Sequence, residues 1–267
     1  MRVYIGAAGF PGLTGVNVIN HIASMAKSRT TDLAVPPPRH LPHIHTEADL
    51  DAGLAALGAI DPRFVAIIAQ TGRPPLRRRA HGYAGLAAII VSQQLSTASA
   101  GAIWGRLIAA IDPFEPAAIL RARPARLARL GLSGAKIRAL KAIARAIAKG
   151  EIDLAKLVDV PADTAHAALT VLHGVGPWTA DIYLLACLGH ADAWPAGDLA
   201  LQEAARLAFD LPARPTTKEM APLGDQWRPW RSIAARVLWS YYRLRKGREG
   251  APVQPAKTPV KRGKNGR

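Results

Sequence analysis

Apolar residues recur every three to four positions through most of the chain, which is the period of an α-helix. Leu86, Ile89 and Ile90 share one such face, and Ile137 and Leu140 begin another. No convincing stretch alternates apolar and polar residues as a half-buried strand would. The pattern therefore predicts an all-α fold. The predicted helices cover residues 47–57, 62–70, 83–94, 97–111, two short helices within 116–130, then 133–149, 153–158, 162–172, 177–188, 199–209, 217–222 and 229–245.

The helical pattern does not reach either end of the chain. Residues 1–44 lack the sequence pattern of a folded domain. We interpret residues 1–24 as an upstream extension without a function of its own. Met25 is an alternative first residue of the protein. Residues 246–267 are rich in Lys, Arg, Gly and Pro and predict a disordered basic tail. The folded domain is thus expected over residues 45–245.

A Gly-Val-Gly turn separates two of the predicted helices. Gly174 and Gly176 lack a Cβ, so the chain can turn tightly and approach another molecule closely. Pro177 suits the first position of the following helix, whose free N–H groups would face an anion. An ordinary helical hairpin needs the same glycines, so the turn alone leaves both interpretations open.

The amino-acid composition narrows the classes of partner that the protein is expected to bind. A formal net charge of +16 and a pI near 10.7 favour a polyanion such as nucleic acid, although a basic proteome would give the same excess. The single cysteine, Cys187, excludes a disulfide framework and an iron–sulfur cluster. His81, His173 and His190 lack metal-ligand spacing, so no metal site is predicted. No apolar run is long enough to predict a membrane span.

Three segments carry a family resemblance. Residues 172–198, LHGVGPWTADIYLLACLGHADAWPAGD, resemble the helix-hairpin-helix and Gly/Pro-rich loop with catalytic Asp of a superfamily of DNA base-excision glycosylases. Residues 88–96, AIIVSQQLS, and 227–239, WRPWRSIAARVLW, resemble further segments of its alkylbase branch, the 3-methyladenine DNA glycosylase II type. The resemblance covers residues 83–245. It implies two helical subdomains with the active site in the cleft between them.

The resemblance also implies roles for single residues. Asp198 matches the catalytic Asp, and it also suits the N-cap of the next helix. Trp178 stands where bifunctional members carry a Schiff-base lysine, so the enzyme is expected to be monofunctional. Trp178 and Trp239 match the base pocket, whereas Trp239 is also compatible with a core position. The pocket tyrosine of the family is replaced by Ile182, and the neighbouring Tyr183 would point elsewhere.

DNA contacts follow from the same resemblance. Gly174, Gly176 and Thr179 are expected to bind a phosphate, and Lys136 is a second possible phosphate contact. Gln94 matches the side chain that plugs the duplex after a base is flipped, unless the glutamines bond internally. No cofactor is required, but a monovalent cation at the hairpin is possible. Asp181 and Asp192 are interpreted as surface or capping acids.

These features predict a DNA glycosylase for alkylated bases in double-stranded DNA, with 3-methyladenine as the principal substrate and 7-methylguanine as a further candidate. The expected protein is a cytoplasmic monomer. Two alternatives remain: a glycosylase for deaminated or oxidised bases, and a helix-hairpin-helix DNA-binding protein without catalysis.

Overall fold

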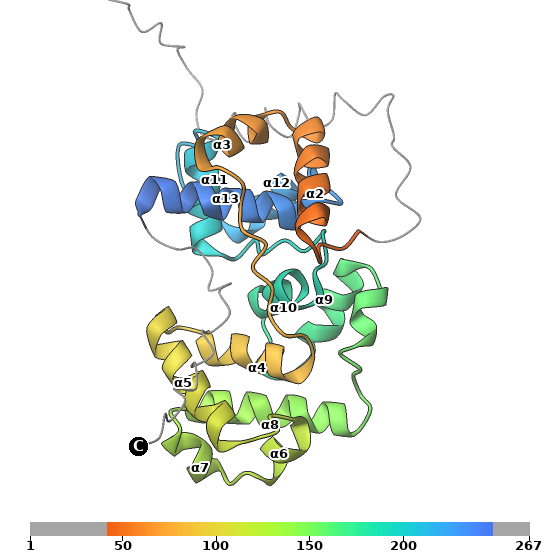
Figure 1. Ribbon diagram of the computed structural model, residues 1–267, viewed down its shortest axis with the longest axis vertical. Helices are drawn as coiled ribbons and strands as arrows, with labels where there is room; N and C mark the ends of the chain where they lie inside the picture. Colours follow the sequence, from red (N-terminus) through yellow and green to blue (C-terminus); the bar gives the residue numbers. More distant parts are fainter. Residues whose placement is uncertain (1–41, 248–267) are drawn as a thin grey trace, which may run out of the picture. The chain divides into compact units, whose positions relative to one another are not determined.

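The computed structural model describes residues 42–247, drawn in colour in Figure 1. The predictions for residues 1–41, including Met25, and for 248–267 lie outside the described residues. The helices are α2 (Glu47–Ile60), α3 (Arg63–Thr71), α4 (Gly82–Ser92), α5 (Thr97–Ala110), α6 (Pro116–Arg121), α7 (Pro124–Arg129), α8 (Gly134–Ala148), η1 (Lys156–Asp159), α9 (Ala162–Thr170), α10 (Pro177–Tyr183), η2 (Leu184–Leu188), α11 (Leu199–Ala208), α12 (Thr217–Asp225) and α13 (Arg231–Lys246). Residues 42–247 hold no strand, only an isolated bridge between His43 and His190, and the all-α prediction is confirmed.

Local chemistry explains where several helices begin. Thr46 and Thr216 form capping boxes at α2 and α12, and the Ser133 hydroxyl accepts the Lys136 amide at the start of α8. Two predicted helices differ from the structure, one in its end and one in its type. The helix expected to stop at residue 222 runs through Pro222 to Asp225. The helix expected over residues 177–188 changes at Leu184 into a π-turn, η2, that ends at Gly189 in the left-handed conformation.

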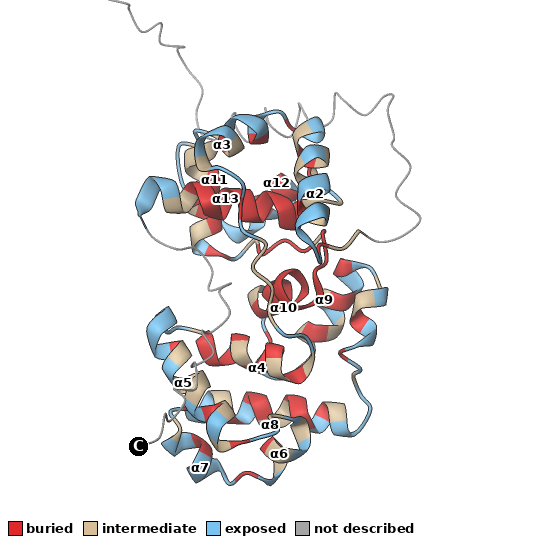
Figure 2. Ribbon diagram, viewed as in Figure 1, coloured by how far each residue is buried: buried red, intermediate tan, exposed pale blue. Residues whose placement is uncertain are grey.

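The helices form two packed groups (Figure 1). In the hairpin group, α4 packs against α5, α8 and α10, while α6 and α7 pack on α8 and α9 packs on α10. In the C-terminal group, α13 packs against α2, α3 and α11. Figure 2 shows buried residues concentrated in α13, on which α2, α3 and α11 assemble, and in α10, which packs against α4 and α9. The loop between η2 and α11, residues 189–198, joins the two groups.

The first described residues belong to this fold. The amide of Ile44 donates to the carbonyl of Gly189 at 2.7 Å, and the amide of Ala191 donates to the carbonyl of Pro42 at 3.1 Å. Ile44 is also buried in the core. The folded part therefore begins by residue 42, a few residues before the predicted boundary at 45.

Candidate active site

The hairpin between α9 and α10 is closed by its own backbone. The amide of Val175 donates to the carbonyl of Leu172 at 3.0 Å, and Gly174 adopts φ +86°, a conformation that favours glycine. A Cβ at Gly174 would also collide with the Cβ of Ala139 on α8. Gly174 is thus required both by the turn and by its close packing on α8.

The same hairpin leaves donors for a ligand. Gly174 and Gly176 are exposed, and within residues 42–247 their amides donate no hydrogen bond. Pro177 then starts α10, as predicted. Unpaired amides before a helix N-terminus are suited to bind an anion such as a phosphate.

Asp198 lies where the two helix groups meet. It is the N-cap of α11: its Oδ1 accepts the Leu201 amide at 2.8 Å. The indole N–H of Trp178, in the first turn of α10, donates to Oδ2 at 2.9 Å. The indole N–H of Trp239 on α13 donates to Oδ1 at 3.1 Å. Three segments distant in the sequence therefore fix one carboxylate, which is 6% exposed.

The charge of this carboxylate is not neutralised by a partner. All three donors are neutral N–H groups, and within the described chain no Lys, Arg or His forms an ion pair with Asp198. A carboxylate offers about four acceptor positions, so one remains for a water or a substrate. A fixed, buried and uncompensated negative charge is suited to stabilise a developing positive charge.

The two tryptophans present different parts of their rings. Both direct the indole N–H edge at Asp198, which leaves the ring faces for other contacts. Trp178 is partly exposed, whereas Trp239 is nearly buried, so both interpretations of Trp239, as a core residue and as a site residue, describe its position. The indole of Trp178 cannot form a Schiff base.

The residues near the expected pocket tyrosine are buried. Tyr183 faces the start of α4, where its hydroxyl oxygen accepts the Gly82 amide at 3.1 Å. Burial raises the pKa of Tyr183 above its usual range. Ile182 is completely buried as well. Tyr183 therefore does not substitute for a tyrosine at position 182, as the helical geometry predicted.

The turn between α4 and α5 presents two side chains outward. Gln94 is exposed and has φ +56°, while the Nε2 of the preceding Gln93 donates to the Thr179 hydroxyl at 2.9 Å. Within residues 42–247, Gln93 bonds internally and Gln94 does not. Leu95, which our sequence reasoning missed, is 38% exposed beside Gln94. Its signal was an apolar residue in a polar turn.

Two expected phosphate contacts point into the protein. Thr179 is 2% exposed, and its hydroxyl is engaged with Gln93. The Lys136 ammonium donates to the carbonyls of Val91 and Gln93 at 2.7 and 2.9 Å, at the C-terminal end of α4. Burial also lowers the pKa of Lys136. Both side chains hold the α4–α5 turn in place, and their positions do not suit the phosphate contact that we expected.

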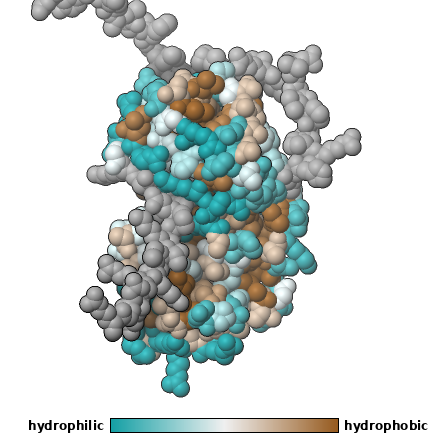
Figure 3. Space-filling view, viewed as in Figure 1, coloured by the Kyte–Doolittle hydropathy of each residue, from teal (hydrophilic) through white to brown (hydrophobic). Residues whose placement is uncertain are grey.

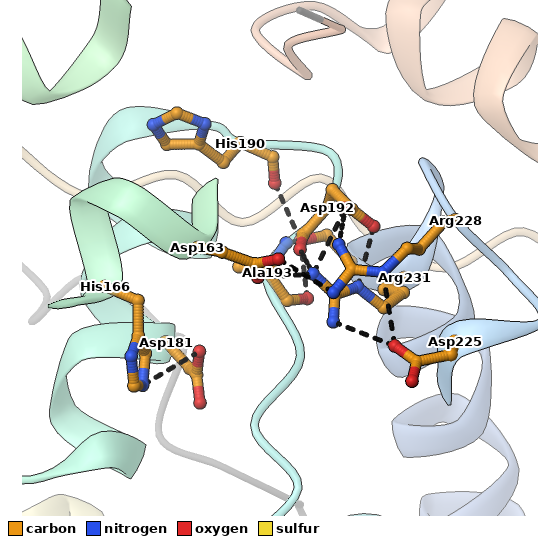
Figure 4. Close-up of polar contacts among 10 residues, drawn as sticks. Asp163, His166, Asp181, His190, Asp192, Ala193, Asp225, Arg228 and Arg231 are labelled. Carbon is orange, nitrogen blue, oxygen red and sulfur yellow. Dashed lines mark hydrogen bonds and ion pairs between the residues drawn. The ribbon is translucent and has the colours of Figure 1, made fainter. Parts of the chain in front are cut away.

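The acids after the hairpin are not simple surface or capping groups. Asp192 accepts from Arg231 at 2.7 Å and from Arg228 at 2.6 Å, and Arg231, which is 8% exposed, also reaches Asp163 on α9 at 2.9 Å (Figure 4). This ion-pair network ties the first hairpin helix to α13 and to the 189–198 loop. It thereby supports the position of Asp198.

Asp181 is the second acid whose interpretation was wrong. It is buried, and burial raises its pKa well above the usual value for a carboxyl group. The Nε2 of His166 lies 3.7 Å from its Oδ1 (Figure 4). Its place inside the protein, facing α9, gives it a structural role.

Residues 42–247 lack two kinds of feature. No helix there is both long and apolar enough to cross a membrane. No group of three or more His, Cys, Asp or Glu side chains there is placed to hold a metal ion.

Comparison with known proteins places this geometry in a family. Residues 87–229 match the family described as HhH-GPD superfamily base excision DNA repair protein. The chain is 32% identical over 206 residues to a probable bifunctional transcriptional activator/DNA repair enzyme AlkA of Mycobacterium tuberculosis, covering 73% of this chain but only 40% of that protein.

Two solved structures have a similar fold. One is a DNA-3-methyladenine glycosidase from Bacillus halodurans, with a TM-score of 0.65, 27% identity, and coverage of 71% of this chain and 88% of that one. The other is the 3-methyladenine DNA glycosylase Mag1 of fission yeast, Schizosaccharomyces pombe, in complex with abasic DNA, with a TM-score of 0.64, 26% identity, and coverage of 73% and 97%. Since the family match spans more than half of the chain, this protein belongs to the HhH-GPD superfamily of base excision DNA repair proteins.

Proposed function

We propose that this chain is a DNA glycosylase that excises alkylated bases, principally 3-methyladenine and also 7-methylguanine, from double-stranded DNA. The observation that carries the proposal is the Asp198 carboxylate, which three neutral donors fix without neutralising its charge. Relatives named as 3-methyladenine glycosylases support the choice of substrate. The expected product is an abasic site at which base excision repair begins.

Asp198 stabilises the transition state of base removal. Cleavage of the C1′–N bond develops oxocarbenium character on the sugar, as in glycoside hydrolysis. The carboxylate stabilises that charge, and its remaining acceptor position orients the attacking water and takes its proton. A base alkylated at N3 or N7 carries a positive charge and leaves as a neutral molecule. Such a leaving group needs little help from a general acid.

The tryptophans explain both the substrate class and the outcome. The electron-rich face of an indole attracts a cationic base by stacking and cation–π interaction, while the N–H edge stays on Asp198. Trp178 stands at the position where bifunctional members of the superfamily carry a Schiff-base lysine. Because an indole cannot replace that amine in an attack on C1′, water is the nucleophile. The enzyme is monofunctional: it leaves the DNA strand intact.

The target base must leave the stack to reach Asp198. The amides of Gly174 and Gly176 hold a phosphate near the lesion, and the exposed Gln94 and Leu95 fill the space that the flipped base vacates. An apolar side chain that wedges between bases is a common device in proteins that distort DNA.

A monovalent cation fits the hairpin. The carbonyls of Gly174 and Val175 accept no hydrogen bond within residues 42–247, and neutral carbonyl oxygens suit a cation of low charge. When bound, such an ion would supply positive charge beside a DNA phosphate and would take no part in bond cleavage.

Excision from defined duplexes tests the proposal. Each duplex carries one lesion: 7-methylguanine, 3-methyladenine, hypoxanthine, uracil or 8-oxoguanine. We expect release of the methylated bases, with strand cleavage only after alkali treatment. Release confined to deaminated or oxidised bases would replace the proposed substrate class. Spontaneous strand cleavage would contradict monofunctional chemistry, and binding without release of any base would leave a DNA-binding protein without catalysis.

A further inference from the structure

A long acid-free segment lies next to the hairpin. Residues 116–150, which include α6, α7 and α8, contain nine Lys or Arg residues and no Asp or Glu. This segment supplies more than half of the net charge of +16. In Figure 3, hydrophilic side chains gather at the lower end of the view, where Figure 1 places α6 and α7. The nine are Arg121, Arg123, Arg126, Arg129, Lys136, Arg138, Lys141, Arg145 and Lys149.

Part of this segment forms a groove that meets the hairpin. Its volume is about 510 Å³, and Arg138, Lys141 and Arg145 of α8 line it together with Pro124 of α7 and His173 of the hairpin. Gly174, the next residue after His173, packs directly on Ala139 of α8. The groove, which we call the α8 groove, is therefore continuous with the amides that we assign to a phosphate.

The charges of the α8 groove are available to a ligand. Arg138 and Arg145 are exposed, and within residues 42–247 neither has a carboxylate partner. Lys141 donates to the carbonyl of Leu120 at 2.9 Å, which leaves its charge unneutralised. Ile137 and Ala142 also line the groove and add apolar surface to it.

The spacing of the cations fits a nucleic-acid strand. Arg138 and Arg145 are two helical turns apart, about 10 Å along the axis at 1.5 Å per residue. Each strand of B-DNA rises about 3.4 Å per phosphate along the duplex axis, so a strand that runs along α8 presents more than one phosphate over this distance. The apolar lining fits the sugars, and the cations fit the phosphates.

We propose that the α8 groove is a second binding track for the DNA backbone, which receives the strand beyond the phosphate held by the hairpin. This inference rests on the proposed function in that DNA is the ligand. The contacts are sequence-independent, so they position the duplex and do not select the lesion. Their loss should weaken binding to damaged and undamaged DNA alike.

The experiment compares two double variants of the full chain. Arg138→Gln/Arg145→Gln removes two groove cations. The matched control, Arg121→Gln/Lys156→Gln, removes the same charge at exposed positions that do not line the groove and already have a carboxylate neighbour. The dissociation constant for an undamaged duplex is measured against salt concentration. Since each phosphate contact contributes about 0.9 to the log–log slope, the groove variant should lose about 1.8 and the control much less.

Duplex length supplies an independent readout. Duplexes are shortened stepwise from either end. The difference in dissociation constant and salt slope between wild type and the groove variant should vanish once the duplex arm that reaches the groove is removed. Equal slopes for both double variants, or a difference that does not depend on length, would overturn the proposal. So would an unchanged DNA slope combined with loss of binding to a polyglutamate peptide, since that would assign the groove to an acidic protein partner.

Folding and the proposed function are checked separately. The urea-unfolding midpoint of the groove variant should equal that of wild type, because Arg138 and Arg145 are exposed and have no carboxylate partner within residues 42–247. If wild type released no base while the groove variant still showed the smaller salt slope of DNA binding, the proposed function would fail and the groove assignment would stand.

Discussion

Replacing either indole that holds Asp198 by phenylalanine isolates the contribution of one N–H donor. Trp178 provides the only hydrogen bond within residues 42–247 to Oδ2, at 2.9 Å. Trp239 shares Oδ1 with the Leu201 amide, at 3.1 and 2.8 Å. Phenylalanine keeps an aromatic face in each case and removes the donor. We therefore expect Trp178→Phe to impair excision more than Trp239→Phe.

The magnitude follows from the type of bond. A hydrogen bond to a charged group contributes about 1.5–3 kcal/mol. If all of it were lost from the transition state, the rate would fall by about 10- to 150-fold, since about 1.4 kcal/mol corresponds to a tenfold change. Trp239→Phe leaves Oδ1 with one donor, so its rate should stay within about tenfold of wild type.

Single-turnover excision from a 7-methylguanine duplex at saturating enzyme measures this effect. Binding should change little, because stacking survives. Trp104→Phe, in α5 against Phe114, is the matched control and should excise at the wild-type rate. If Trp178→Phe and Trp239→Phe both behaved like this control, the indoles would not hold the carboxylate. If they weakened binding and left the rate unchanged, their role would be stacking alone.

Three further variants test the surroundings of the site. Gly174→Ala forces a Cβ into Ala139 at φ +86° and should weaken binding of an undamaged duplex by at least tenfold. Gly176→Ala is the control: its Cβ would lie in open space at φ −87°, and this variant should bind the duplex within a few-fold of wild type. Arg231→Gln removes a buried guanidinium that donates to both Asp163 and Asp192, and it should lower the free energy of unfolding in urea by about 3 kcal/mol. Arg228→Gln, at a more exposed position, should cost about 1 kcal/mol or less; equal losses would refute the ranking. Asp181 has a raised pKa in the folded protein, so its contribution to stability is complete below the pKa of the unfolded chain and is lost as pH rises through the folded value. Asp181→Asn should therefore raise the urea concentration at the unfolding midpoint relative to wild type at pH 8 but not at pH 4. A difference between the two midpoints that did not change with pH would contradict this.

The helices and the glycine turn could be predicted because their causes are local. Apolar spacing, Pro177 and the capping residues act within a few positions, and the structure places nearly all predicted helices. The extension of α12 through Pro222 and the π-turn after Tyr183 depend on tertiary packing, which overrides local preference.

The sequence predicts which residues form the site better than it predicts how their side chains are oriented. The resemblance gave Asp198, Trp178 and Trp239, but not that both indoles donate to one carboxylate. The inward positions of Thr179 and Lys136 depend on the side-chain amide of Gln93 and on backbone carbonyls at the end of α4, which no sequence spacing reveals. Asp192 was misread for the same reason: its partner Arg231 lies 39 residues away.

Asp198→Asn tests the central claim most directly. Asparagine retains an oxygen for the Leu201 amide, so the N-cap survives while the negative charge disappears. The measurement is the single-turnover rate of 7-methylguanine release at saturating enzyme, with duplex affinity measured in parallel. If the carboxylate stabilises the sugar cation, the rate should fall by about 100-fold or more and affinity should stay near that of wild type. Release within a few-fold of wild type would show that the charge of Asp198 does not drive excision.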